Sequence, residues 1–280
     1  MARNRNRIYR ILEFVRSRVW ISLFASLLSL SACEHQSAAS REGTASSRAA
    51  PNEGGADTPV LVELYTSQGC SSCPPADDLL HELVRDRRGT PLVPLVFHVD
   101  YWDTLGWPDP FSDPRWTTRQ LHRARATGRS NIYTPQLLFD GEDHRVGTQR
   151  SRARAALRSE SAVPPAVDLR VTIEQGRDSI HVFTHPRWRD AAERSSLTIM
   201  VAITDSGHHT EILGGENAGL TWAGDYVVRD MDRACTFSPE QDTADCDVTL
   251  SLGAIDDPQT MQIVAFAQDA RWRIVGLATR

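Results

Sequence analysis

The chain has 280 residues, of which 40% are hydrophobic and 24% are charged, a balance typical of globular proteins and sufficient for two ordinary domains. All 31 basic residues are arginine, so chemistry that depends on a lysine amine is excluded. The net charge of −5 argues against a nucleic-acid partner, because such binding requires a basic surface that neutralises phosphates.

Residues 1–32 have the pattern of a signal peptide. An arginine-rich start leads to an apolar run at 19–30, which is shorter than the roughly 18 residues of a membrane-spanning helix. The run ends in Leu-Ser-Ala-Cys33, which resembles a bacterial lipoprotein box and implies cleavage and lipidation at Cys33. The alternative is ordinary secretion without modification. Residues 33–57, rich in Ala, Ser, Gly and Glu, are predicted to be a flexible tether. We therefore expect a protein anchored by lipid on the periplasmic side of a bacterial membrane.

The cysteines fit an exported protein. Besides Cys33, they form two pairs that are close in sequence, Cys70 with Cys73 and Cys235 with Cys246. Disulfides persist in oxidising compartments. We predict that Cys235 and Cys246 form a structural disulfide that closes a loop.

Strands and helices alternate in the first predicted domain, residues 58–162. We predict an apolar strand at 60–66, a helix at 74–86, a strand at 92–99 and a helix at 115–127. Two short strands within 135–147, joined at Asp140-Gly141, and a helix at 148–160 complete this α/β domain. A Val-Pro-Pro sequence at 163–165 then marks a change. Short alternating strands follow to the end, and they predict an all-β sandwich-like domain at 163–280.

Two resemblances arise from these features. A CxxC motif opening a helix after a strand, with Thr134-Pro135 before a later strand, resembles the thioredoxin fold. That resemblance implies a cis Pro135 beside the cysteines and a Thr134 backbone that contacts a bound polypeptide. The strings VELYTSQGCSSCPPADDLL, IYTPQLLFDG and GGENAG resemble a secreted thioredoxin-like family catalogued as domain of unknown function 1223. Gln68 and Gly69 stand where ordinary thioredoxins carry tryptophan.

The leading functional prediction is a thiol–disulfide oxidoreductase that acts on extracytoplasmic protein thiols. Cys70, at the helix start, is expected to be an accessible nucleophile whose thiolate the free helix amides stabilise. Cys73, one turn further, is expected to resolve the mixed disulfide. Glu63, His98 and Asp100 are candidates for proton handling.

Three alternatives remain open at this stage. The Cys70–Cys73 pair could be a permanent structural disulfide. The same cysteines with His98 could bind Cu(I), since soft thiolates favour that ion, and the protein would then be a non-enzymatic copper-binding or partner-binding module. The aromatic residues within 98–111 could form a partner groove or pack a small core of their own. No cofactor is expected for the oxidoreductase, and Cu(I) is expected only under the copper-binding alternative.

Overall fold

The computed structural model describes residues 58–86, 89–190, 194–255 and 257–280, which lie within one compact unit, Glu53–Arg280. Cys33, the predicted signal peptide and the predicted tether up to residue 57 lie outside the described residues. Within the described ranges, no helix is both long enough and apolar enough to span a membrane.

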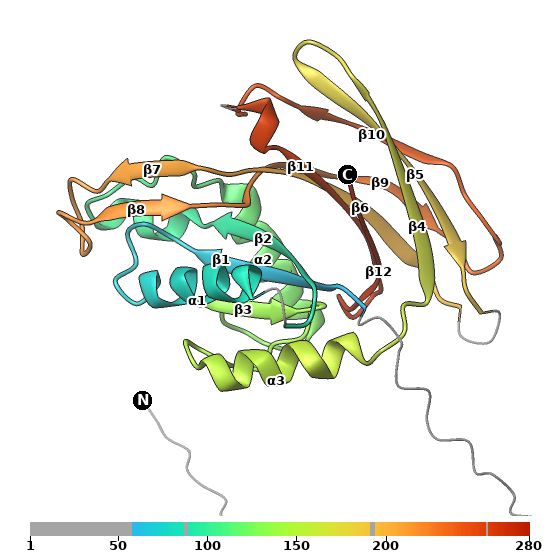
Figure 1. Cartoon of the computed structure of the whole chain (residues 1–280), viewed down its shortest axis with the longest axis horizontal. Helices are drawn as coiled ribbons and strands as arrows, with labels where there is room; N and C mark the ends of the chain where they lie inside the picture. Colours follow the sequence, from blue (N-terminus) through green and yellow to red (C-terminus); the bar gives the residue numbers. More distant parts are fainter. Residues whose placement is uncertain (1–57, 87–88, 191–193, 256) are drawn as a thin grey trace, which may run out of the picture. The chain divides into compact units, whose positions relative to one another are not determined.

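In the first half of this unit, the described residues form three strands and four helices, and Figure 1 shows how they are arranged. The strands are β1 (Val60–Thr66), β2 (Leu92–His98) and β3 (Gln136–Phe139), and the helices are α1 (Pro74–Arg85), the 3₁₀ helix η1 (Asp100–Leu105), α2 (Pro114–Ala126) and α3 (Arg150–Ser161). The predicted order agrees with this with two exceptions. The helix η1 was not predicted, and the second of the two strands expected in 135–147 is reduced to an isolated bridge between Phe139 and Glu142.

The second half is built almost entirely of strands. They are β4 (Val167–Gln175), β5 (Ser179–Trp188), β6 (Leu197–Asp205), β7 (His208–Glu211), β8 (Thr221–Gly224), β9 (Val227–Phe237), β10 (Cys246–Ser251), β11 (Gln262–Gln268) and β12 (Ile274–Thr279), with a short 3₁₀ helix η2 (Pro258–Thr260).

Strand β1 is buried along its whole length because helices cover both of its faces. Side chains alternate between the two faces of a strand. Val62 and Leu64 accordingly pack with α1 and α3, whereas Leu61 and Tyr65 pack with Trp116 of α2 on the opposite face. This layering holds the carboxyl end of β1 and the start of α1 in fixed positions.

One seven-stranded sheet joins the two halves of the sequence, with the order β12-β11-β6-β9-β2-β1-β3. The junction is a parallel contact between β2 and β9, at Val96 and Val227, where the Val96 amide donates to the Tyr226 carbonyl at 2.9 Å. The predicted domain boundary at 162/163 therefore does not separate two sheets. Strand β2 is apolar on both faces, and a neighbour on its second edge satisfies backbone groups that would otherwise be unpaired.

The remaining strands form smaller antiparallel sheets, β10-β5-β4 and β7-β8. The three-stranded sheet packs face to face on β6 and β11, with Ile180, Val182, Val201 and Ile203 in the shared core. Sandwich-like packing is thus present in residues 163–280, but one of its two layers is the sheet that continues into the first half. Cys235 of β9 and Cys246 of β10 are bonded and connect the two layers.

Candidate functional site

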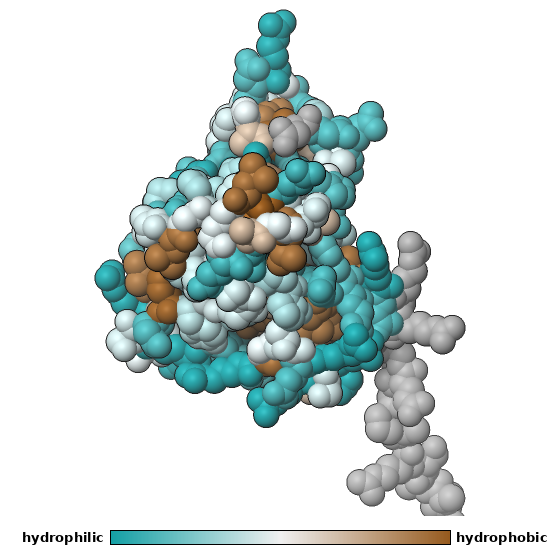
Figure 2. Space-filling model, turned by 90° about the vertical axis from the view of Figure 1, so that its left-hand side faces the viewer, coloured by the Kyte–Doolittle hydropathy of each residue, from teal (hydrophilic) through white to brown (hydrophobic). Residues whose placement is uncertain are grey.

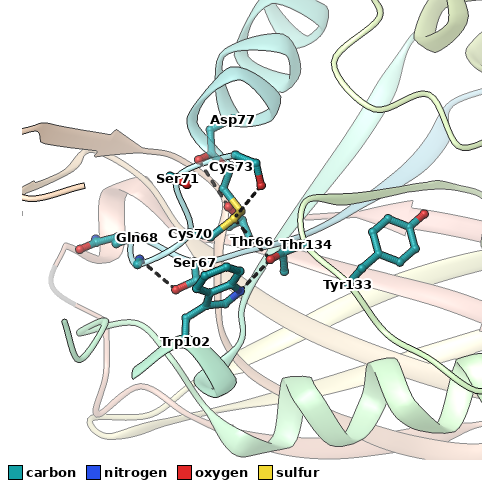
Figure 3. The surroundings of a disulfide bond; sticks show 12 residues. Thr66, Ser67, Gln68, Cys70, Ser71, Cys73, Asp77, Trp102, Tyr133 and Thr134 are labelled. Carbon is teal, nitrogen blue, oxygen red and sulfur yellow. Dashed lines mark hydrogen bonds between the residues drawn. A yellow bond between two sulfur atoms is a disulfide. The ribbon is translucent and has the colours of Figure 1, made fainter. Parts of the chain in front are cut away.

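The site lies where β1 ends and α1 begins. Cys70 and Cys73 form a disulfide with a Cα–Cα distance of 5.4 Å, and both residues are fully buried (Figure 3). Cys73 is the N-cap residue of α1, and Pro74 and Pro75 occupy the first helical positions. In this disulfide state Cys70 does not have the exposure that the sequence led us to expect of an attacking sulfur.

The peptide bond between Thr134 and Pro135 is cis, and it lies beside the disulfide. The Thr134 hydroxyl donates to the Cys70 Sγ at 3.4 Å, and the Ser72 hydroxyl is also 3.4 Å from this sulfur. The Trp102 Nε1–H donates to the Thr134 Oγ1 at 2.8 Å. An indole N–H can only donate, so Thr134 accepts from Trp102 and keeps its own proton for the sulfur. Trp102 therefore orients Thr134.

Backbone amides offer the Cys70 sulfur fewer hydrogen-bond donors than we predicted. Pro74 and Pro75 have no N–H group, and the Cys73 amide donates to the Cys70 carbonyl at 3.1 Å. The Ser71 amide donates to the Glu216 carboxylate at 3.2 Å. The side-chain hydrogen bonds that reach the Cys70 sulfur come from Thr134 and Ser72. Hydroxyl groups are therefore the nearest candidates for stabilising a Cys70 thiolate.

Removing the Thr134 hydroxyl should make Cys70 less acidic in the reduced protein. We expect Thr134→Val to raise the Cys70 pKa by about half to one unit, the value of one hydrogen bond, while Thr134→Ser, which keeps the hydroxyl, should change it little. The measurement is the pH dependence of Cys70 alkylation by iodoacetamide, followed on the peptide that contains it. Equal pKa values in the Val and Ser variants would contradict this role.

Gln68 connects the cysteine loop to two distant segments, and all four of its hydrogen-bonding groups have partners. Its amide N–H donates to Asp109 Oδ2 at 2.8 Å, and its carbonyl accepts from Asn217 Nδ2 at 2.8 Å. Its side chain accepts from Trp107 Nε1 and donates to Thr210 Oγ1, both at 3.1 Å. Gln68 thus anchors the loop that carries Cys70.

The three residues proposed for proton handling lie in structural contacts. Glu63 accepts from the Arg119 guanidinium at 2.7 Å, and both are buried. Asp100 accepts from the Thr117 hydroxyl of α2. His98 Nδ1 is 2.7 Å from Asp109 Oδ2. Among the described residues, no hydrogen bond joins any of the three to either cysteine.

The aromatic residues of 98–111 pack into the protein instead of forming an open groove. Phe111 and Trp222 of β8 both lie against the His98 ring, at centroid distances of 5.5 and 4.9 Å. Trp107 packs on the same cluster. His98 is therefore enclosed, and its Nε2 has no hydrogen-bond partner among the described residues. The aromatic residues of this segment therefore join cores shared with other elements, which differs from both interpretations, an open groove and a small core of its own.

The sequence did not indicate a role for Asp77, an acidic residue in the first turn of α1. Burial raises the pKa of Asp77 to about 7, against opposing effects of His98 and a hydrogen bond from Thr66. Its side chain also lines a cavity of about 190 Å³ between α1 and the β7–β8 hairpin. Asp77 is therefore a group near Cys73 that exchanges protons near neutral pH.

The raised pKa of Asp77 predicts a pH-dependent difference in stability. The folded protein holds this proton up to about pH 7, whereas the unfolded chain loses it near 3.8, so the wild type loses stability as the pH rises between these values. Asp77→Asn avoids that loss. We expect the free energy of unfolding of Asp77→Asn, relative to that of the wild type, to rise by about 1–3 kcal/mol between pH 4 and pH 8. Urea denaturation at each pH measures this difference. The exposed neighbour Asp78, changed to Asn, is the control, and the same pH dependence in both variants would contradict the assignment.

The described residues contain no group of three or more His, Cys, Asp or Glu side chains arranged to hold a metal ion. The Cu(I) alternative with Cys70, Cys73 and His98 stays a prediction. In this structure the two sulfurs are bonded to each other.

Fold and site together define a mixed α/β protein that carries a CxxC disulfide at the start of its first helix, on a large mixed sheet accompanied by two antiparallel sheets. Residues 61–268 match the family described as "Protein of unknown function (DUF1223)", and the chain belongs to that family. The two cysteine pairs at bonding distance fit a secreted protein.

Solved structures with a similar fold are known. A protein from Agrobacterium tumefaciens is 25% identical, with a TM-score of 0.57 over 79% of this chain and 92% of that one. HBP35 of Porphyromonas gingivalis is 11% identical, with a TM-score of 0.60 over 81% of this chain and 76% of that one. None of the curated proteins is a match.

Proposed function

We propose that this protein is an exported thiol–disulfide oxidoreductase with a thioredoxin-like first half, anchored through Cys33, that acts on extracytoplasmic protein thiols. The observation that carries the proposal is the Cys70–Cys73 disulfide at the start of α1 with Thr134 Oγ1 3.4 Å from the Cys70 sulfur. The strand–helix–strand order around the motif and the cis bond before Pro135 support the thioredoxin-like assignment.

The exchange proceeds in two steps. A partner thiolate attacks the Cys70 sulfur, the Cys70–Cys73 bond breaks, and Cys73 leaves as a thiolate that takes up a proton. A second partner thiolate then attacks the mixed disulfide and releases Cys70 as a thiolate, so two electrons pass from the partner dithiol to the protein. The reverse sequence reduces a partner disulfide. The Thr134 and Ser72 hydroxyls stabilise the Cys70 thiolate. Asp77, four residues after Cys73 on α1, is a candidate to supply the proton that the Cys73 thiolate takes up.

One observation favours a second candidate, a closed structural disulfide. Both cysteines are fully buried, and the Trp102–Thr134 contact lies beside Cys70. Exchange therefore requires these contacts to open, whereas a structural disulfide needs no access. The copper-binding module has less support, because the Nδ1 of His98 bonds to Asp109 and aromatic rings enclose the imidazole.

The experiment that separates these candidates is capture of a mixed disulfide. Cys73→Ser lacks the sulfur that resolves the intermediate, so an oxidoreductase should remain linked through Cys70 to partner proteins in cells. A structural disulfide predicts no adducts that depend on Cys70.

A further inference from the structure

The loop that joins β7 to β8 reaches the cysteine loop from 140 or more residues further along the chain. Figure 1 shows the β7–β8 hairpin at the end of the sheet where α1 begins. Glycines allow its close approach, because a Cβ atom at Gly214 would lie 2.3 Å from the Gly106 carbonyl oxygen. Gly215 has a φ of +70°, a conformation that glycine adopts without steric cost. The hairpin loop therefore packs closely against the backbone at Gly106.

Two consecutive residues of this loop hold the backbone around Cys70. The buried Asn217 side chain donates to the Gln68 carbonyl at 2.8 Å and to the Cys70 carbonyl at 3.0 Å. Glu216, beside it, accepts the Ser71 amide hydrogen at 3.2 Å. The hydrogen bonds from Ser71 lower the pKa of Glu216, so its carboxylate is ionised at neutral pH. A fixed negative charge thus lies one residue from the proposed nucleophile.

We infer that Glu216 is a positioning residue that makes Cys70 harder to ionise and thereby favours the disulfide over the dithiol; the inference rests on the proposed function. Two effects act in the same direction. The carboxylate repels a developing thiolate, and it accepts the Ser71 amide hydrogen, so this amide next to Cys70 is already engaged. A less stable thiolate means a less stable reduced form, and hence a less oxidising protein.

The other titratable and charged groups around the loop lie on different elements. Asp77 is on α1, and the His98–Asp109 pair comes from β2 and the segment after η1, with Asp109 bonded to the Gln68 amide. Glu216 differs from these groups in being fully exposed. Figure 2, which faces this end of the molecule, shows a surface where hydrophilic residues surround separate apolar groups. Salt should therefore weaken the effect of Glu216.

The test compares Glu216→Gln with Glu211→Gln in the full chain after reduction with a phosphine. Glu211 is a matched control, because it is an exposed carboxylate on β7 of the same hairpin. Glutamine at 216 removes the charge but can still accept the Ser71 amide hydrogen. We expect Glu216→Gln to lower the pKa of Cys70 in the iodoacetamide assay. We also expect it to shift the exchange of the protein disulfide with two glutathione thiols, which yields the dithiol and glutathione disulfide, about two- to fivefold towards the dithiol.

Glu211→Gln should leave both quantities unchanged, and 1 M salt should reduce the effect of Glu216→Gln. Identical behaviour of the two variants would overturn the inference, and so would a higher Cys70 pKa in Glu216→Gln. A phosphine reduces the disulfide whether or not the protein has redox partners, so this test does not depend on the trapping experiment. A failure to trap mixed disulfides would overturn the proposed function but would leave these measurements valid.

Discussion

Cys73→Ser is expected to accumulate mixed disulfides with exported proteins, visible as adducts on non-reducing gels that disappear on reduction. With Cys73 present, its sulfur attacks the mixed disulfide from within the same loop, at a high effective concentration, and the adduct is short-lived. Serine cannot perform this attack, so the linkage to Cys70 persists. Mass spectrometry of the adducts would identify the partner proteins.

The controls for this experiment are Cys70→Ser and the double variant Cys235→Ser/Cys246→Ser. Cys70→Ser should form no adducts, and its reduction of insulin or glutathione disulfide should fall to the level of the uncatalysed reaction. The double variant removes a disulfide that joins two sheets and, when combined with Cys73→Ser, should still trap partners through Cys70. Equal turnover by the wild type and Cys70→Ser would contradict the oxidoreductase proposal. Loss of thermal stability on reduction, without adducts, would support a structural disulfide.

Glu63→Gln should lower the free energy of unfolding by about 3–5 kcal/mol, the cost of leaving one member of a buried ion pair without its partner. Glu63 Oε1 accepts from both Nε and an Nη of Arg119, at 3.0 and 2.7 Å, and both residues are buried. Arg119 also donates to Gln268 of β11, so the pair ties β1 and α2 to the second half of the sheet. Urea denaturation measures the change.

The same variant tests whether Glu63 handles protons, as its position on the strand before the cysteines suggested. A structural role predicts an unchanged Cys70 pKa in Glu63→Gln. Replacing both charges by apolar residues, Glu63→Leu with Arg119→Met, should recover much of the lost stability, because no buried charge remains unpaired. A stable Glu63→Gln with a shifted Cys70 pKa would restore the catalytic interpretation.

Local sequence patterns predicted several parts of this protein well. The apolar run at 60–66, the amphipathic helix after Pro74 and Pro75 and the alternating strands from 167 onward all form as expected. Each is specified by residues within a few positions of one another, because side-chain periodicity and backbone restrictions act over one or two turns. The closeness of Thr134 to the cysteines also agreed with the expected fold.

The features that complete the site depend on contacts between distant residues. Asn217 lies 149 positions from Gln68, to which it donates, and β2 pairs with β9 across more than half of the described chain. The burial of Cys70 and the partial burial of Asp77 likewise arise from the packing of separate elements. A single sequence shows periodicity along the chain, but it does not specify which strand edges pair or which charged side chains come close together. These contacts result from the joint burial of the apolar faces of several elements. The residues themselves therefore predicted the CxxC motif, the strands and the helices. The sheet shared by both halves, the carboxylate beside Ser71 and the burial of the Cys70 sulfur were decided only by the tertiary structure.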